Sequence, residues 1–230
     1  MSKNLLITGA SRGIGRAAAL LAAADGWAVG VNYRNDRAAA YEVVAQIEAM
    51  GGKAVALPGD VANEEDVLRL FEAMDQFGPL HGLVVNAGIV APPMPLLDMS
   101  SERLRRMFEV NVLGSYLTAR EGARRMARSR GGNGGSMVLV SSVAASLGSP
   151  FEYVDYAGAK GAMDVLTRGL AKELGGEGVR GQRRAPGADR YRDSRQRRPA
   201  GPRRAPGQGD TTGTRRPRRG SRRGDRLATR

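Results

Sequence analysis

Short apolar runs alternate with longer helical segments along the first 180 residues, and this alternation limits the possible folds more than any other feature of the chain. Strand-like runs occupy 4–10, 27–33, 53–60, 80–88 and 135–142, and helix-like segments occupy 15–26, 36–52, 64–78, 100–129 and 155–175. Strands that alternate with helices predict parallel β-α-β units, and therefore an α/β fold with a doubly wound parallel sheet. Because ligands bind such sheets beyond the carboxyl ends of the strands, we expect the functional residues directly after each run.

The first apolar run leads into a glycine-rich loop, "TGASRGIG", from Thr8 to Gly15. Gly9 permits a tight turn, Gly13 lets the backbone approach a pyrophosphate, and Gly15 allows the next helix to pack closely on the strand. The amino end of that helix supplies N–H groups and a positive dipole end, which favour a phosphate group. An ordinary strand-to-helix turn is the alternative, but the flanking strand and helix favour a Rossmann-like dinucleotide-binding unit.

The end of the second apolar run bears on the choice of dinucleotide. An acidic residue there would bind a ribose 2′-hydroxyl, but the sequence is Asn32, Tyr33, Arg34, without a carboxylate. Arg34 and Arg12 could together hold a 2′-phosphate by charge-assisted hydrogen bonds. The alternative is that both arginines are simply solvated. The pattern favours NADP(H) over NAD(H).

Tyr156 and Lys160 stand four residues apart in "DYAGAK", on one face of a predicted helix. The ordinary tyrosine pKa is about 10, which makes the phenol a poor acid or base at neutral pH. A neighbouring ammonium group stabilises the phenolate and lowers that pKa. The tyrosine could then exchange a proton with a substrate oxygen near neutral pH.

Together these motifs resemble the short-chain dehydrogenase/reductase family. The matches span nearly all of 1–180 in the family's order: Thr8-Gly9-x-x-x-Gly13-x-Gly15, Asp60-Val61, Asn86-Ala87-Gly88, Asn111, Ser141-Ser142 and Tyr156-x-x-x-Lys160. The resemblance implies an oxidoreductase that interconverts a carbonyl and a secondary alcohol by hydride transfer. The stretch "GSPFEYVDYAGAKGAMD" is similar to sugar-type and 3-oxoacyl-type members. Cytoplasmic homo-oligomers, dimers or tetramers, are expected of the family.

The resemblance also implies a role for each matched residue. Tyr156 would donate or accept the proton, Ser142 would hydrogen-bond the reacting oxygen, and Lys160 would bind the nicotinamide ribose. Asn111 would hold a water that relays protons to Lys160. The expected cofactor-binding residues are Gly9, Ser11, Arg12, Gly13, Ile14, Gly15, Asn32, Tyr33, Arg34, Asp60, Val61, Asn86, Ala87, Gly88, Tyr156 and Lys160. Asp60 would contact the adenine, and Asn86 the adenosine side.

Several residues compete with these assignments or fall outside them. Tyr153 competes with Tyr156 but lies seven residues from Lys160, and Ser141 competes with Ser142, whose spacing to Tyr156 is one longer than the commonest in the family. With one histidine and no cysteine, a metal site is not expected, and disulfides are excluded. The remaining single-residue predictions are a structural role for His81, core or helix packing for Phe108 and Tyr116, and solvated helix faces for Arg105, Arg106, Arg124 and Arg125.

The last fifty residues, 181–230, differ sharply from the rest. They hold 17 arginines and four aspartates, which is the whole formal charge of +13 and leaves 19 basic and 19 acidic residues in 1–180. They lack Val, Ile, Met, Phe and Trp, so they cannot offset the entropy of ordering a core. We therefore expect an incomplete catalytic domain at 1–180, and a disordered tail at 181–230 that replaces the sixth and seventh strands.

The genetic code supplies a reason for this change of composition. One permitted coding of residues 181–193, read one base later, gives "VNAVRPGLIDTE", which is similar to the family's sixth strand and Pro-Gly loop. Residues 210–217 permit "TPLGRAG" in the shifted frame. We interpret 181–230 as the product of a frameshift near codon 181, which sequencing the gene tests.

Two other interpretations stay open. A cofactor-binding scaffold could attach to RNA through the Arg-rich segment, although nucleic acid is not the expected partner because that segment lacks lysine and interleaved aromatic residues. An inactive frameshifted product is the other interpretation. The expected partner is a small carbonyl or alcohol substrate, and no apolar stretch is long enough to predict a membrane span.

Overall fold

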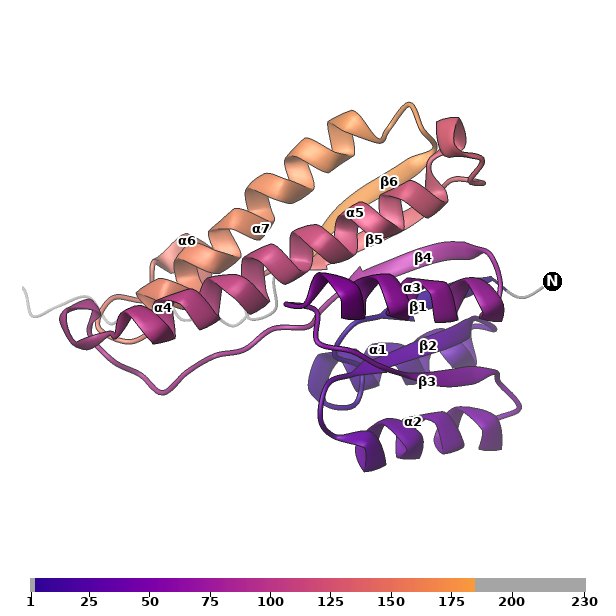
Figure 1. Ribbon diagram of the computed structural model, residues 1–230, viewed down its shortest axis with the longest axis horizontal. Coiled ribbons are helices and arrows are strands. Elements are labelled where there is room, and N and C mark those ends of the chain that lie inside the picture. The colour runs from indigo at the N-terminus through magenta and orange to yellow at the C-terminus, as the bar shows by residue number, and fades with distance from the viewer. Residues whose placement is uncertain (1–2, 185–230) are drawn as a thin grey trace, which may run out of the picture. The chain divides into compact units, whose positions relative to one another are not determined.

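The structure is a computed structural model that describes residues 3–184, apart from the side chain of Arg183. These residues lie in the first of two compact units, Met1–Gln196. They form one parallel six-stranded sheet in the order β3-β2-β1-β4-β5-β6 (Figure 1). The strands are β1 Asn4–Ile7, β2 Ala28–Tyr33, β3 Ala54–Pro58, β4 Leu80–Val85, β5 Gly135–Val140 and β6 Val179–Arg184.

Helices cover both faces of the sheet, so the predicted doubly wound, Rossmann-like fold is confirmed. One apolar cluster joins α1 Gly13–Ala24 and α2 Arg37–Ala49 to the sheet through residues such as Ile7, Val31 and Ile47. The other joins α3 Glu64–Phe77, α5 Gly114–Met126 and α7 Val154–Glu173 to the opposite face. The direction of winding changes between β1 and β4, which is where ligands bind in such sheets.

Side-chain caps explain where several helices begin. The side chains of Asp36, Asn63 and Ser100 accept hydrogen bonds from backbone N–H groups in the first turns of α2, α3 and α4 (Ser101–Phe108). Each cap satisfies a donor that has no partner within the helix. In α3 the first turn is also acidic, which suits the positive end of the helix dipole.

The segment predicted as one helix at 100–129 is divided in the structure. After α4, a π-helical turn, Glu109–Leu113, leads into α5. The Ser115 hydroxyl donates to the Asn111 carbonyl at 2.8 Å, and a Cβ on Gly114 would lie 2.9 Å from Val61. Helical periodicity does not reveal such a turn, because the residues on either side stay helical. Shorter elements are the 3-10 turns Leu96–Asp98 and Arg128–Arg130, and α6 Ala144–Leu147.

The sixth strand differs from the expectation that the tail replaces it. Val179–Arg184 form β6, which runs parallel to β5 and pairs Gly181 with Met137. The Ser141 N–H also donates to the Arg184 carbonyl at 2.7 Å. Backbone groups make these bonds, so a strand forms here without the apolar pattern that would have predicted it. The predicted boundary at 180 falls inside β6, and the predictions for 185–230 lie outside the described residues.

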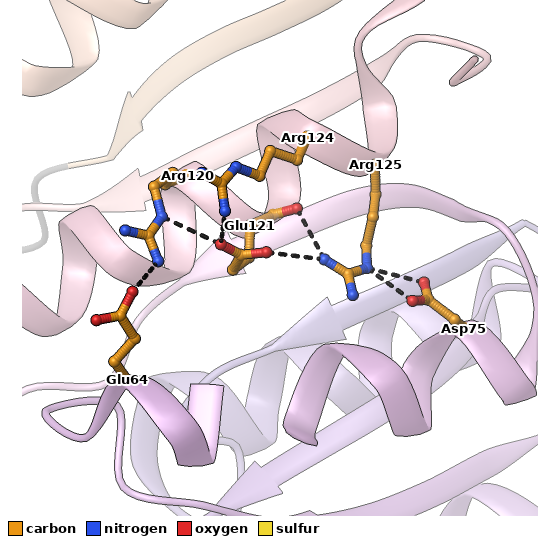
Figure 2. A network of polar contacts seen from close by, with 6 residues as sticks. All are labelled: Glu64, Asp75, Arg120, Glu121, Arg124 and Arg125. Atoms are coloured by element: carbon orange, nitrogen blue, oxygen red, sulfur yellow. Dashed lines mark hydrogen bonds and ion pairs between the residues drawn. The ribbon is translucent and has the colours of Figure 1, made fainter. Parts of the chain in front are cut away.

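Charged side chains join α5 to α3. Arg125 is partly buried, contrary to the solvated face predicted for it, whereas Arg124 is exposed, as predicted. Glu121 is buried on α5 and receives hydrogen bonds from Arg120, Arg124 and Arg125 at 2.8–3.1 Å (Figure 2). Arg125 also binds Asp75 on α3 at 2.9 Å, and Arg120 binds Glu64 at 2.6 Å. The buried carboxylate is thus surrounded by three guanidinium groups, two of which bridge to α3.

Three further side chains can be compared with their predictions. His81 has the predicted structural role, since its Nδ1 accepts a hydrogen bond from the Asn4 N–H at 3.1 Å. Phe108 and Tyr116, predicted to lie in the core or to pack on helices, are both 44% exposed, so neither lies in the core.

Candidate active site

The glycine-rich loop between β1 and α1 has a backbone that requires glycine. Gly9 and Gly13 have φ values of 62° and 56°, in the left-handed region that disfavours other residues. A Cβ on Gly15 would lie 2.4 Å from the Gly9 carbonyl oxygen and 2.7 Å from Asn86 Nδ2. Arg12, the residue before α1, makes no side-chain cap hydrogen bond. The open turn and the uncapped helix end fit a bound pyrophosphate.

A pocket of about 360 Å³ runs along this loop and the ends of the neighbouring strands. Of the predicted cofactor-binding residues, those that line it are Gly9, Ser11, Arg12, Ile14, Asn32, Tyr33, Arg34, Asp60, Val61, Asn86, Ala87 and Gly88. Gly13 and Gly15 shape the loop, while Tyr156 and Lys160 line an adjoining pocket. The pocket therefore collects residues from four separate strand ends, as expected for a dinucleotide site.

Two asparagines in this pocket serve mainly to hold the loop in place. Asn32 is buried, accepts from the Gly9 N–H at 3.0 Å, and donates to the carbonyls of Leu57 and Gly59 at 3.1 Å. Asn86 Nδ2 donates to the carbonyls of Thr8 and Gly9. These amide groups make extensive contacts within the protein, so the structure gives them a part in positioning the glycine loop that the sequence alone did not indicate.

Where β2 and β3 end, Asp60 joins two arginines. Arg34 Nε lies 2.9 Å and Arg106 Nη2 lies 3.1 Å from the same oxygen, Asp60 Oδ2. Burial alone would raise the pKa of Asp60, but the Ala62 N–H and the two guanidinium groups outweigh burial and hold this pKa below its ordinary value. Arg106, predicted to be solvated, lines the pocket as well. The signal that could have revealed it is the carboxylate at the end of β3, which needs a cationic partner when partly buried.

Ser142, Tyr156 and Lys160 meet in a second pocket of about 190 Å³. Four residues, Ile14, Asn86, Gly88 and Ile89, line this pocket and the dinucleotide pocket alike. The two pockets are therefore neighbours. The sequence predicted this only indirectly, because the residues of both pockets follow the carboxyl ends of strands in one sheet.

Lys160 is buried and lies close to the tyrosine. Its Nζ donates to the Val140 carbonyl at 2.8 Å and stands 5.7 Å from the centre of the Tyr156 ring. Burial lowers the pKa of Lys160 to about 8. The lysine is thus still largely protonated at neutral pH, and its charge can stabilise a nearby phenolate.

The structure separates the competing residues. Ser141 is buried and its hydroxyl donates to the Lys160 backbone carbonyl, whereas Ser142 is half-buried and accepts from the Ala144 N–H at 3.2 Å. Both serines line the pocket, but Ser142 is the more accessible. Tyr153 stands at the residue before α7, makes no side-chain cap hydrogen bond, and does not line either of the two pockets described above.

Asn111 lies in the π-helical turn and is buried. Its side-chain amide exchanges two hydrogen bonds of 2.9 Å with the backbone of Ile89, which lines both pockets. A Cβ on Gly88 would lie 2.5 Å from Asn111 Oδ1. The amide thus fixes the segment 88–89 against the π-helical turn, and a role in proton relay remains a prediction.

The short chain dehydrogenase model matches residues 3–197 of the sequence. The chain belongs to the short-chain dehydrogenase family. This short-chain dehydrogenase is 49% identical to the Escherichia coli (strain K12) protein named uncharacterized oxidoreductase YgfF. The match extends over 176 residues, which are 76% of this chain and 71% of that protein. The chain is 40% identical over 179 residues to L-rhamnose 1-dehydrogenase (NAD(P)(+)) of Sphingomonas sp. (strain SKA58), covering 77% and 69%.

A solved relative carries a bound dinucleotide. The crystal structure of a short-chain dehydrogenase from Burkholderia cenocepacia J2315 in complex with NADP is similar to this chain with a TM-score of 0.73 and 34% identity, over 79% of this chain and 72% of that one. Within residues 3–184, no helix of this short-chain dehydrogenase is long and apolar enough to cross a bilayer. In the same range no group of His, Cys, Asp or Glu side chains is arranged to hold a metal ion.

Proposed function

We propose that the chain is an NADP-dependent oxidoreductase that interconverts a carbonyl and a secondary alcohol, with a sugar as the favoured substrate. One observation carries this proposal: Ser142, Tyr156 and Lys160 line a pocket that shares four residues with the dinucleotide pocket. A substrate oxygen in the smaller pocket would lie beside both the hydroxyl groups and the reactive end of the cofactor.

The dinucleotide would be held by the glycine loop together with Arg34 and Asn86. When bound, it supplies or accepts the hydride. During reduction the Tyr156 hydroxyl donates its proton to the substrate oxygen, and during oxidation the phenolate accepts it. The Ser142 hydroxyl hydrogen-bonds the same oxygen and stabilises the charge that develops there. The Lys160 ammonium, held by the Val140 carbonyl 5.7 Å from the centre of the Tyr156 ring, stabilises the phenolate by its charge.

The charges at the adenosine end support the preference for NADP. Arg34 and Arg12 line the dinucleotide pocket, and Arg34 is held there by Asp60 through Nε. Both Nη groups of Arg34 can still donate to a phosphate oxygen, which the planar guanidinium favours. The solved Burkholderia relative binds NADP, which is consistent with this choice.

The preference for a sugar rests on the similarity to L-rhamnose 1-dehydrogenase. The test is a spectrophotometric assay of the full chain, 1–230, with NADP(+) and a panel of aldoses that begins with L-rhamnose. A 3-oxoacyl thioester with NADPH serves as the alternative substrate. Turnover of an aldose supports the proposal; turnover of the thioester alone corrects the substrate class; and turnover of neither, in a chain that binds NADPH, contradicts an oxidoreductase of this kind.

A further inference from the structure

A buried ion pair stands directly beside Tyr156. Arg103 on α4 donates to Asp155 through Nε at 2.8 Å and through Nη2 at 3.3 Å. The Asp155 side chain is 0% exposed and that of Arg103 is 12% exposed. Removing two charged groups from water costs free energy. The fold tolerates such a pair only when the two groups are well aligned and their remaining polar atoms have hydrogen-bond partners.

The same pair ties three segments together. Arg103 Nη1 donates to the Pro92 carbonyl at 2.7 Å, in the segment that follows β4. Asp155 Oδ1 also accepts from the Tyr156 N–H at 2.9 Å, at the first turn of α7. Since α4 leads directly into the turn that holds Asn111, Arg103 connects that turn, the segment after β4 and the start of the tyrosine helix.

We propose that Arg103 and Asp155 are positioning residues for Tyr156: their ion pair fixes the start of α7 so that the tyrosine hydroxyl faces the substrate pocket beside Lys160. This inference rests on the proposed function, because it assumes that Tyr156 transfers the proton. Neither residue lines the pocket that Ser142, Tyr156 and Lys160 share, which supports an action through Tyr156. Arg103 does line a third pocket, which shares Ile89 and Arg106 with the dinucleotide pocket.

The ion pair between Arg103 and Asp155 stays charged at neutral pH. Burial alone would raise the pKa of Asp155, but hydrogen bonds from Arg103 and the Tyr156 N–H outweigh burial and hold that pKa below its ordinary value. The carboxylate is therefore ionised throughout the neutral range. A small displacement of a reacting group can cost on the order of 100-fold in rate, which is why a pair outside the pocket matters.

The experiment compares Arg103→Met and Arg103→Lys with Arg105→Met, a control on the same helix whose side chain is exposed. We expect Arg103→Met to lower kcat on the order of 10- to 100-fold with less than about a twofold change in the KM for NADPH, Arg103→Lys to be intermediate, and Arg105→Met to behave as the unchanged protein. A kcat within about twofold of the unchanged protein in both Arg103 variants overturns the inference. Should Arg103→Met fail to fold, Arg103→Lys alone is judged by the same criterion.

A second measurement separates positioning from a loss of folded protein. Arg103→Met is combined with Tyr156→Phe, and kcat and the Kd for NADPH are measured for the double variant beside each single variant. Because the pair is proposed to act through Tyr156, Arg103→Met should not lower further the residual kcat of Tyr156→Phe, and the Kd for NADPH should stay within about twofold. A further fall in the residual kcat by the same factor as in the unchanged protein overturns the inference, as does a Kd that rises as kcat falls. Full activity of Tyr156→Phe alone would instead overturn the proposed function, so the two failures are distinguishable.

Discussion

The Lys160 ammonium group stands 5.7 Å from the centre of the Tyr156 ring and donates a 2.8 Å hydrogen bond to the Val140 carbonyl. The four-residue spacing on α7 places the two side chains on one face, and the end of β5 supplies the acceptor. The lysine is buried at the wall of the pocket that Ser142 and Tyr156 also line, where its charged form is costly. If the proposed function holds, the arrangement favours function at the expense of stability.

The first prediction concerns that cost. Burial lowers the Lys160 pKa from 10.5 to about 8, so the charged lysine reduces the free energy of unfolding. This reduction has its full size below pH 8 and disappears as the pH rises to 10.5. Lys160→Met should therefore be more stable than the unchanged protein at neutral pH, by about 2 kcal/mol after the lost hydrogen bond is counted. Urea unfolding at several pH values measures this. An advantage that stays constant or grows as pH rises from 8 to 10.5 would contradict the prediction.

The second prediction concerns the choice of cofactor. Arg34→Ala removes a guanidinium from the adenosine end of the dinucleotide pocket. The KM for NADPH should rise at least about tenfold, because charge-assisted hydrogen bonds are worth about 1.5–3 kcal/mol, while the KM for NADH should change little. Steady-state kinetics with both cofactors measures the ratio. Equal effects on the two cofactors would show that Arg34 does not recognise the 2′-phosphate.

The third prediction concerns the buried carboxylate in Figure 2. Glu121→Gln keeps the shape but leaves three guanidinium groups around a neutral amide, so the free energy of unfolding should fall by about 3 kcal/mol. Thermal and urea unfolding measure the change, with Glu72→Gln, an exposed glutamate on α3, as the control. The control should change by less than about 0.5 kcal/mol. Similar effects in both variants would mean that the network contributes nothing beyond surface charge.

The fourth prediction concerns β6. A Cβ on Gly181 would meet the backbone and Cβ of Ala171 at 3.4–3.5 Å, which is ordinary contact. Gly181→Val should therefore stabilise the protein by about 1 kcal/mol, because glycine weakens a strand and valine favours one. Valine is also the residue that one permitted coding gives at this position in the shifted frame. Gly51→Ala, at a φ of 79°, is the opposite control and should destabilise the protein. Loss of stability in Gly181→Val would argue against a native valine at this position.

The sequence predicted the fold well where local pattern and tertiary structure agree. Buried parallel strands are continuous apolar runs, so the first five strands were recognisable, although the runs extend past the strands at 8–10, 86–88 and 141–142. Those extra residues form the loops that line the pockets. The sixth strand was missed because its hydrogen bonds come from the backbone and its side chains do not follow an apolar pattern.

The candidate site was predicted less completely. The glycine loop and the Tyr156–Lys160 pair follow from spacing, since they lie at a strand end and on one helical face, whereas Ser142 follows from the family resemblance. Arg103 and Arg106 were missed because their partners, Asp155 and Asp60, are distant in sequence and no local pattern joins them. Long-range ion pairs of this kind depend on how the elements pack, which a single sequence does not show.

Two tyrosines near the start of α7 allow the most direct test of the central claim, that Tyr156 transfers the proton. Tyr156→Phe and Tyr153→Phe each remove one hydroxyl, and only Tyr156 lines the pocket with Ser142 and Lys160. The measurement is kcat with NADPH bound, with the Kd for NADPH as the check on the fold. We predict that Tyr156→Phe lowers kcat by on the order of 100-fold or more with an unchanged Kd, while Tyr153→Phe stays near the unchanged protein. Activity retained in Tyr156→Phe, or lost equally in both variants, would contradict the proposed mechanism.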